Sequence, residues 1–139
     1  MENQLVKRVV LDTNVLISAI GFGGKPRQVL TAVLKKELSA VTSPILLAEL
    51  EEILGKKLDF EPVMIQLILK EIENEFIIVH PSKTIKVLSD DDDNRVLEAA
   101  QEGKCNYIIT GDKELLELKK YKSISILTPD SFLSLKDKS

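Results

Sequence analysis

The sequence predicts an α/β protein, in which a parallel sheet carries helices on both faces. Segments with the pattern of strands alternate with segments with the pattern of helices along the whole chain, and this order is typical of a parallel sheet. The strand expected at Lys7–Asp12 contains the run VVL without polar alternation, which indicates burial on both faces. With 139 residues and 44% hydrophobic residues, the chain can bury one sizeable core, so we expect a single domain over residues 1–139.

Turn and helix signals divide the first half of the chain. Thr13 and Asn14 can cap a helix that directly follows the first strand. A proline that suits the first turn of a helix occurs three times in this half of the chain, at Pro26, Pro44 and Pro62. The helices expected here are Val15–Ile20, a helix from Pro26, Pro44–Gly55 and Pro62–Asn74, and the strands are Ser39–Thr42 and Phe76–Val79.

The second half of the chain begins with an acidic turn, Asp90–Asp93, that leads into a helix. On a helical wheel Asp93 shares one face with Val96, Leu97 and Ala100, so its carboxylate should point toward the core. A carboxylate buried without a partner costs several kcal/mol, and a bound metal ion is one way to remove that cost. A charge that only stabilises the helix N-terminus explains Asp93 equally well. The other three aspartates of the turn are expected to be solvated.

The remaining elements follow the same alternation. We expect a strand at Tyr107–Thr110, a helix at Lys113–Tyr121, a strand at Ile124–Leu127 and a short terminal helix capped by Asp130. The strand Tyr107–Thr110 delivers Asp112 at its carboxyl end. Asp112 can also serve as the N-cap of the helix that follows it, and the sequence favours neither role.

Four acids therefore stand out by position: Asp12, Glu49, Asp93 and Asp112. Asp12 and Asp112 follow strands, while Glu49 and Asp93 lie on or beside the inward faces of helices. Sites of open α/β sheets occur at the carboxyl ends of the strands. Because several close carboxylates repel one another, they need cations or protons, and all-oxygen ligands favour Mg²⁺ or Mn²⁺.

Composition restricts the function classes. No apolar run approaches the roughly 20 residues of a membrane span, and the N-terminal residues lack the apolar segment of a signal peptide. The only cysteine, Cys105, cannot form an internal disulfide, so we expect a cytoplasmic protein. The net charge of −3 counts against a simple nucleic-acid binder, unless the acids bind cations.

Three stretches of the sequence resemble the PIN domain family. They are VVLDTNVLISAI, SPILLAELEEIL and DDDDNRVLEAAQEGKCNYIITGDKELL, in this order and at these spacings. The chain is most similar to the stand-alone bacterial and archaeal PIN proteins that are classed as toxins of toxin–antitoxin systems. The resemblance extends from Arg8 to about Leu135.

The resemblance implies a three-layer α/β/α sandwich with a central parallel sheet of four to five strands. It implies Mg²⁺- or Mn²⁺-dependent endoribonuclease activity on RNA and, in many members, an antitoxin protein as partner. The four acids of the family fall on Asp12, Glu49, Asp93 and Asp112, and its supporting polar residues fall on Thr13 or Asn14 and on Thr110.

Several further interpretations remain open. Lys25, Arg27 and Lys113 are candidates for contact with RNA phosphates, the first two in a mobile glycine-rich loop. The wide apolar face of the helix around Ile65–Ile72 indicates a homodimer. The main alternative function is a catalytically silent module that binds RNA or protein. A phosphatase with Asp12 as nucleophile is disfavoured, since such enzymes carry a second aspartate where this chain has Asn14.

Overall fold

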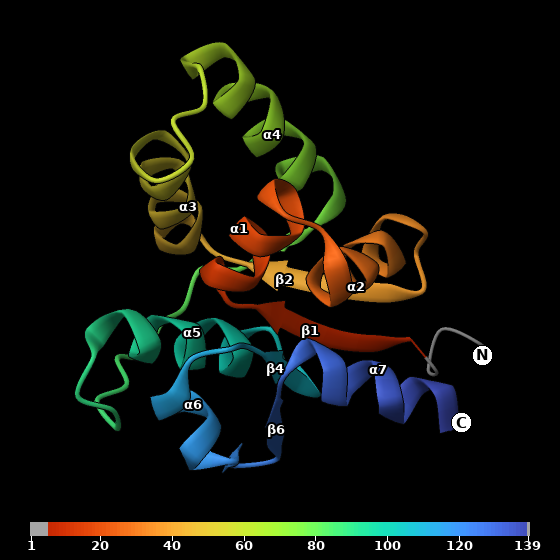
Figure 1. Cartoon of the computed structure of the whole chain (residues 1–139). Coiled ribbons are helices and arrows are strands. Elements are labelled where there is room, and N and C mark those ends of the chain that lie inside the picture. The colour runs from red at the N-terminus through yellow and green to blue at the C-terminus, as the bar shows by residue number, and fades with distance from the viewer. Residues whose placement is uncertain (1–5, 139) are drawn as a thin grey trace.

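A six-stranded sheet forms the centre of the computed structural model, which describes residues 6–138 (Figure 1). Its strands are β1 (Lys7–Leu11), β2 (Leu38–Thr42), β3 (Ile77–Ile78), β4 (Tyr107–Ile109), β5 (Lys120–Tyr121) and β6 (Ile124–Leu127). Their spatial order is β3-β2-β1-β4-β6-β5, and all neighbours are parallel except β5 and β6. The expected α/β/α fold with four to five parallel strands is confirmed, with one antiparallel strand added at an edge.

Helices cover both faces of the sheet. They are α1 (Thr13–Gly21), α2 (Gly24–Leu34), α3 (Pro44–Lys56), α4 (Pro62–Glu75), α5 (Asp91–Glu102), α6 (Lys113–Leu118) and α7 (Pro129–Lys138). Val9 packs with α1, α2, α3, α4 and α7 in one buried apolar cluster. Val10 packs on the opposite face with α5 and α6. Adjacent residues of β1 thus point to opposite cores, which explains why this strand lacks polar alternation. Among the described residues, no helix is long and apolar enough to cross a membrane.

Both edges of the sheet are strands of only two residues, β3 and β5. The sequence predicted a helix over Lys113–Tyr121, but α6 ends at Leu118. Lys119 adopts a positive φ of 64°, which ends the helix and turns the chain back to pair with β6. The rest of the predicted helix forms β5 instead.

Two predicted helix ends were also wrong. Gly55 lies inside α3 and does not terminate it, because the helix continues to Lys56. Asp130 lies in the first turn of α7, and the cap comes from Thr128, whose hydroxyl accepts a hydrogen bond from the Ser131 N–H at 3.0 Å. Single residues that typically end or cap a helix therefore predicted that these helices exist, but they did not predict the exact residue at which each helix begins or ends.

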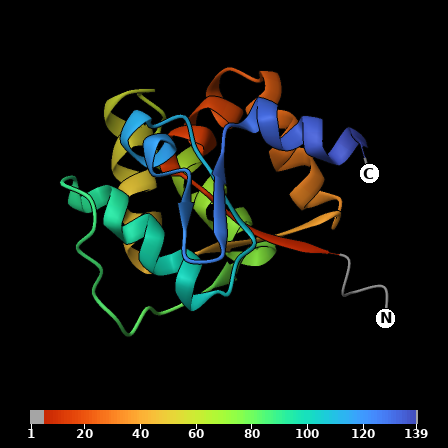
Figure 2. The same cartoon turned by 90° about the horizontal axis from the view of Figure 1, so that it is seen from below.

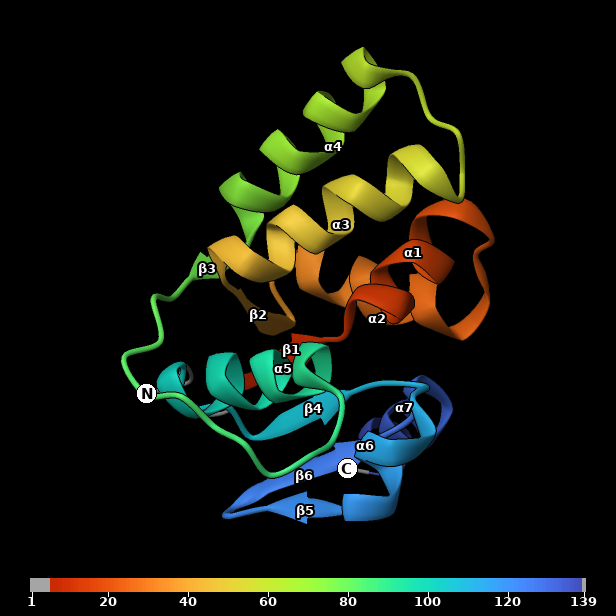
Figure 3. The ribbon, with the colours of Figure 1, turned by 90° about the vertical axis from the view of Figure 1, so that its left-hand side faces the viewer.

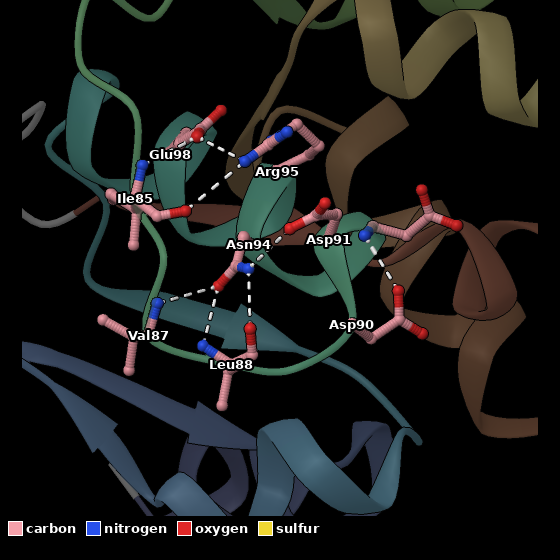
Figure 4. A network of polar contacts seen from close by, with 9 residues as sticks. Ile85, Val87, Leu88, Asp90, Asp91, Asn94, Arg95 and Glu98 are labelled. Carbon is pink, nitrogen blue, oxygen red and sulfur yellow. Dashed lines mark hydrogen bonds and ion pairs between the residues drawn. The ribbon is translucent and has the colours of Figure 1, made fainter.

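A long segment of residues 79–90 connects β3 to α5 and runs along the outer side of that helix (Figure 2). Asn94, which is completely buried, fixes this segment with its side-chain amide (Figure 4). The amide oxygen accepts from the N–H groups of Val87 at 3.2 Å and Leu88 at 2.9 Å. The amide nitrogen donates to the Leu88 carbonyl at 2.8 Å. One side chain thus supplies the hydrogen bonds that a neighbouring strand would otherwise give.

Glu98 fixes the same segment one turn further along α5 (Figure 4). Its carboxylate accepts from the Ile85 N–H at 2.9 Å and forms an ion pair with Arg95 Nη2 at 2.9 Å. Arg95 Nη2 also donates to the Ile85 carbonyl at 3.3 Å. Glu98 is only 8% exposed, so its charge is buried together with its partners.

The strand order brings β1 and β4 together in the middle of the sheet. The carboxyl ends of β1 and β4 lie side by side at one end of the sheet, where the Asp12 N–H donates to the Ile109 carbonyl at 3.0 Å. Helix α5 lies across these two strands (Figure 3). Residues that follow β1 and β4, or that begin α5, therefore meet at the carboxyl ends of these two strands.

Candidate functional site

Asp12 lies at the junction between β1 and α1 and is 6% exposed. The Thr110 hydroxyl donates a hydrogen bond of 2.7 Å to Asp12 Oδ2. Burial raises the pKa of the Asp12 carboxyl, and the hydrogen bond from Thr110 counteracts part of that rise. Thr110 is itself completely buried, so it holds one oxygen of this carboxylate in a fixed direction.

Thr13 does not cap α1, which corrects the sequence expectation. It is the first residue of that helix, and its hydroxyl donates instead to Glu49 Oε1 at 2.7 Å. Glu49 lies half-buried on α3, and burial raises the pKa of its carboxyl. Asn14 is exposed, so of the two polar residues after Asp12 only Thr13 faces the acids.

Asp93 lies in the first turn of α5 and is 7% exposed. Its Oδ2 atom is buried and has no hydrogen-bond partner among the described residues. Burial raises the pKa of this carboxyl to about 8, and the neighbouring Asp112 adds to the rise, followed by Asp90 and Asp12. The carboxylates at this end of the sheet thus act on one another, and within residues 6–138 no basic side chain forms an ion pair with Asp93.

Asp112 is half-buried, and it is the N-cap of the helix that follows it, which is one of the two roles that the sequence allowed. Its Oδ2 atom accepts from the Leu115 N–H at 3.0 Å and so caps α6. Its own N–H donates to the Thr110 hydroxyl at 2.9 Å. Thr110 therefore links the acid that follows β1 to the acid that follows β4.

Glu114 also belongs to this region, and sequence reasoning missed it. Its carboxylate accepts from the Ser89 hydroxyl at 2.7 Å and from the Ser89 N–H at 3.1 Å, which lowers the pKa of Glu114. It lies two residues after Asp112, in the first turn of α6, and a search for acids in that turn would have found it. The contact fixes the start of the acidic turn against α6. Asp90–Asp92 are exposed, but two of them have partners that the sequence did not predict. Asp90 Oδ1 accepts from the Asp92 N–H at 2.9 Å and so caps α5, and Asp91 Oδ1 accepts from Asn94 Nδ2 at 3.3 Å.

The three basic candidates lie on helices. Lys25 and Arg27 belong to α2, which begins at Gly24, so the expectation of a mobile loop was wrong. Arg27 donates from Nε to the Ala19 carbonyl at 2.9 Å and from Nη2 to the Ile20 carbonyl at 3.3 Å, at the end of α1. Lys25 is exposed, as is Lys113 at the start of α6, directly after Asp112. Arg27 thus has a structural partner, whereas both lysines face solvent.

The four acids offer carboxylate oxygens, which are the donor atoms that divalent cations such as Mg²⁺ take. In residues 6–138 no group of three or more His, Cys, Asp or Glu side chains is arranged to hold an ion. Asp12, Glu49 and Asp112 each direct one oxygen to a hydrogen-bond donor of the chain, and each keeps a second oxygen. The partnerless Asp93 Oδ2 and the mutual repulsion of the carboxylates nevertheless fit a cation with oxygen ligands, such as Mg²⁺ or Mn²⁺.

Comparison with known sequences gives two matches. A family model described as the PIN domain matches residues 8–114. An uncharacterized protein of Methanocaldococcus jannaschii is 35% identical over 140 aligned residues, which cover 91% of this chain and 89% of that protein. The family match includes the stretches that hold Asp12, Glu49, Asp93 and Asp112.

Comparison with solved structures gives the same fold at lower sequence identity. VapBC2 of Rickettsia felis, bound to a DNA fragment from its promoter, has a TM-score of 0.60 at 17% identity, covering 86% of this chain and 96% of that chain. PAE2754 of Pyrobaculum aerophilum has a TM-score of 0.60 at 17% identity, with 96% and 91% covered. FitAcB of Neisseria gonorrhoeae has a TM-score of 0.52 at 16% identity, with 87% and 97% covered.

Proposed function

This chain belongs to the PIN domain family, whose members are generally nucleases, and from this premise we propose that it is a Mg²⁺- or Mn²⁺-dependent endoribonuclease. The observation that carries the proposal is the buried Asp93 carboxylate, which lacks a hydrogen-bond partner at Oδ2 and lies among other acids. A folded protein tolerates such a group where it serves a function. We also propose that residues 1–139 form one nuclease domain.

Asp12, Asp93 and Asp112 would hold the ion, and Glu49 would complete the site. When bound, a divalent cation supplies Lewis acidity, which favours ionisation of water and offsets negative charge on the phosphodiester. A set of four carboxylates favours Mg²⁺ or Mn²⁺ over zinc, whose protein sites usually include histidine or cysteine.

The residues of the chain have separable roles in hydrolysis. Thr110 keeps the Asp12 carboxylate in one orientation through the bond to Oδ2. Thr13 does the same for Glu49, and the raised pKa of Glu49 suits a group that orients the attacking water and accepts its proton. Lys25 and Lys113 are exposed and would contact phosphates of the RNA.

The test is cleavage of a mixed single-stranded RNA with Mg²⁺, Mn²⁺ or EDTA, by the wild-type protein and by Asp12→Asn and Asp93→Asn. Asp130→Asn is the matched control, because Asp130 is exposed on α7 and takes no part in the site. We expect cleavage that requires the metal, disappears in the first two variants and is unchanged in the control.

Equal cleavage by all four proteins would indicate a contaminating ribonuclease and refute the site. No cleavage with either metal, together with no metal binding in calorimetry, would favour the alternative of a catalytically silent binding module. Metal binding that is lost in Asp93→Asn would support the ion site by a measurement independent of cleavage.

We further propose that the protein is the toxin component of a toxin–antitoxin system and acts in the cytoplasm. The fold that it shares with VapBC2 and FitAcB supports this assignment, as does the resemblance of its motifs to toxins of that class. Growth arrest of a host on induction of the wild type, and no arrest on induction of Asp12→Asn, is the expected result.

A homodimer is proposed from α4. Ile65, Leu69 and Ile72 face the core, but Val63 and Leu67 on the other side of the helix are 74% and 59% exposed. Two copies that pair through this side would bury these apolar side chains. Light scattering should give twice the mass of one chain for the wild type and a single mass for Leu67→Glu. A single mass for both proteins would contradict the dimer.

A further inference from the structure

A cavity of about 360 Å³ lies between α3 and the first half of α5, directly beside the acids. The two helices run alongside each other on this side of the molecule (Figure 3). Glu49 and Asp92 line the cavity on the side of the proposed ion site, and Ile45 and Ile53 give it an apolar wall. Its volume lies near the lower end of the range of about 300–1,000 Å³ that is typical of small-molecule sites.

The cavity contains a fixed cation beside hydrogen-bond acceptors. Arg95 lines it, and the guanidinium is immobilised because Nη2 is bound to Glu98 and to the Ile85 carbonyl (Figure 4). Arg95 Nε is buried and has no hydrogen-bond partner among the described residues. Glu52 lies at the rim, where its carboxylate is 60% exposed and pairs with Lys56 at 2.8 Å. Nη1 of Arg95 and Oε1 of Glu52 therefore remain available to a ligand, because the other polar atoms of these two side chains are buried or paired.

We propose that this cavity binds one guanine base of the RNA, next to the phosphodiester that is cut; the inference rests on the proposed nuclease function. A carboxylate can accept both N–H groups of the guanine Watson–Crick edge, which Glu52 at the rim would do. A guanidinium nitrogen can donate to guanine O6, and Nη1 of Arg95 would do so. Ile45 and Ile53 pack against the face of the base.

Guanine fits this lining better than the other three bases do. Uracil offers a single ring N–H to the carboxylates, and adenine and cytosine offer one amino group each but no adjacent ring N–H. Because Glu49 lines both the cavity and the acid site, a base bound in the cavity places its own phosphate beside the acids. The cavity therefore determines where along the RNA the chain is cut.

The first test measures base binding without catalysis. Wild-type protein in EDTA is titrated with guanosine, adenosine, cytidine and uridine, and the backbone amide shifts are followed by NMR. We expect guanosine to bind most tightly, with shifts centred on Ile45 and Arg95, and Glu52→Gln to weaken it about tenfold. Glu51→Gln is the matched control, since Glu51 is the adjacent acid and bonds Gln66 at 3.2 Å outside the cavity. Equal binding of the four nucleosides, or no shifts at the cavity, would overturn the inference.

The second test maps cleavage sites in an RNA that contains every dinucleotide step. The wild type and Glu51→Gln should cut beside guanine, and Glu52→Gln should lose that preference by about tenfold. Wild-type cleavage without a base preference, or a preference retained by Glu52→Gln, would refute the base site while leaving the nuclease intact. If no RNA is cut with either metal, the proposed nuclease function fails, and the nucleoside titration still decides the base site.

Discussion

Asp93 and Glu98 are buried on the same helix, at 7% and 8% exposure, but only one of them has a full set of partners. Glu98 is paired with Arg95 and accepts from the Ile85 N–H, so its charge is compensated within the fold. Asp93 has a buried oxygen without a partner, and its neighbours are other acids. The two acids are equally buried, and what distinguishes Asp93 from Glu98 is that one of its buried oxygens has no hydrogen-bond partner among residues 6–138.

The strongest test of this contrast is Asp93→Asn. We expect the metal-dependent cleavage rate to fall about a thousandfold, more than the 10–100-fold typical of losing an outer partner of a metal ligand. The free energy of unfolding without metal should stay the same or rise at neutral pH, because folding of the variant no longer requires the uptake of a proton at this buried position. RNA cleavage and urea unfolding of the same preparation measure the two effects. If unfolding becomes easier, Asp93 is a structural acid like Glu98, and the contrast is wrong.

Glu98→Ala should have the opposite effect, a loss of stability. The change leaves the Arg95 guanidinium and the Ile85 N–H without their acceptor, and removing one member of a buried ion pair costs about 3 kcal/mol. Urea unfolding gives the value, with Glu117→Ala as the control because Glu117 is exposed on α6. A loss no larger than that of the control would show that the fold does not depend on this pair.

The pH dependence of stability sharpens the contrast further. In the folded protein without metal the pKa of Asp93 is raised from 3.8 to about 8, so the unfolded state releases this proton at lower pH. The stability associated with the proton is present below about pH 4 and is lost as the pH rises toward 8, by at most about 1.4 kcal/mol per pH unit. Thermal unfolding from about pH 5 to 8 should show this decline.

Two controls identify the source of that decline. Asp93→Asn should flatten the slope, and saturating Mg²⁺ should do the same in the wild type, since the cation replaces the proton as the compensating charge. A slope that is unchanged in Asp93→Asn would assign the effect to other groups.

The smallest effect is expected for Thr110→Val. The fold should change little, but the hydroxyl that fixes Asp12 Oδ2 and accepts from the Asp112 N–H is lost. We expect cleavage to fall about tenfold, in the range of an outer partner of a metal ligand. Thr110→Ser, which keeps the hydroxyl, should retain most of the activity. Equal losses in both variants would indicate a packing defect.

The sequence was sufficient to predict the order of helices and strands and the burial of one acid of the candidate site. The run VVL predicted a strand buried on both faces, and the structure places Val9 and Val10 in opposite cores. The helical wheel predicted that Asp93 points inward, and it is buried. The signals involved are local, because they depend on spacing within one element.

The rest of the site depends on contacts between distant segments. Thr110 meets Asp12 across 98 positions of the chain, and Glu98 meets the backbone of an irregular segment at Ile85. No periodic pattern marks such a segment, so the difference between Asp93 and Glu98 cannot be predicted from the sequence.

The turn at Lys119 was missed for a related reason, since its positive φ is adopted by a lysine and not by a glycine. Whether the four acids catalyse hydrolysis stays a prediction for the assays above.

The two-residue edge strands β3 and β5 also affect how the molecule behaves at high concentration. An open edge normally offers a row of unpaired backbone groups onto which another chain can add a strand. Here each edge offers two residues, and Lys120 and Lys122 place positive charge at one of them. Because fibrils grow by repeated strand addition, a sheet that ends in this way resists aggregation. We therefore expect the metal-free protein to stay dispersed even while its uncompensated acids lower its stability.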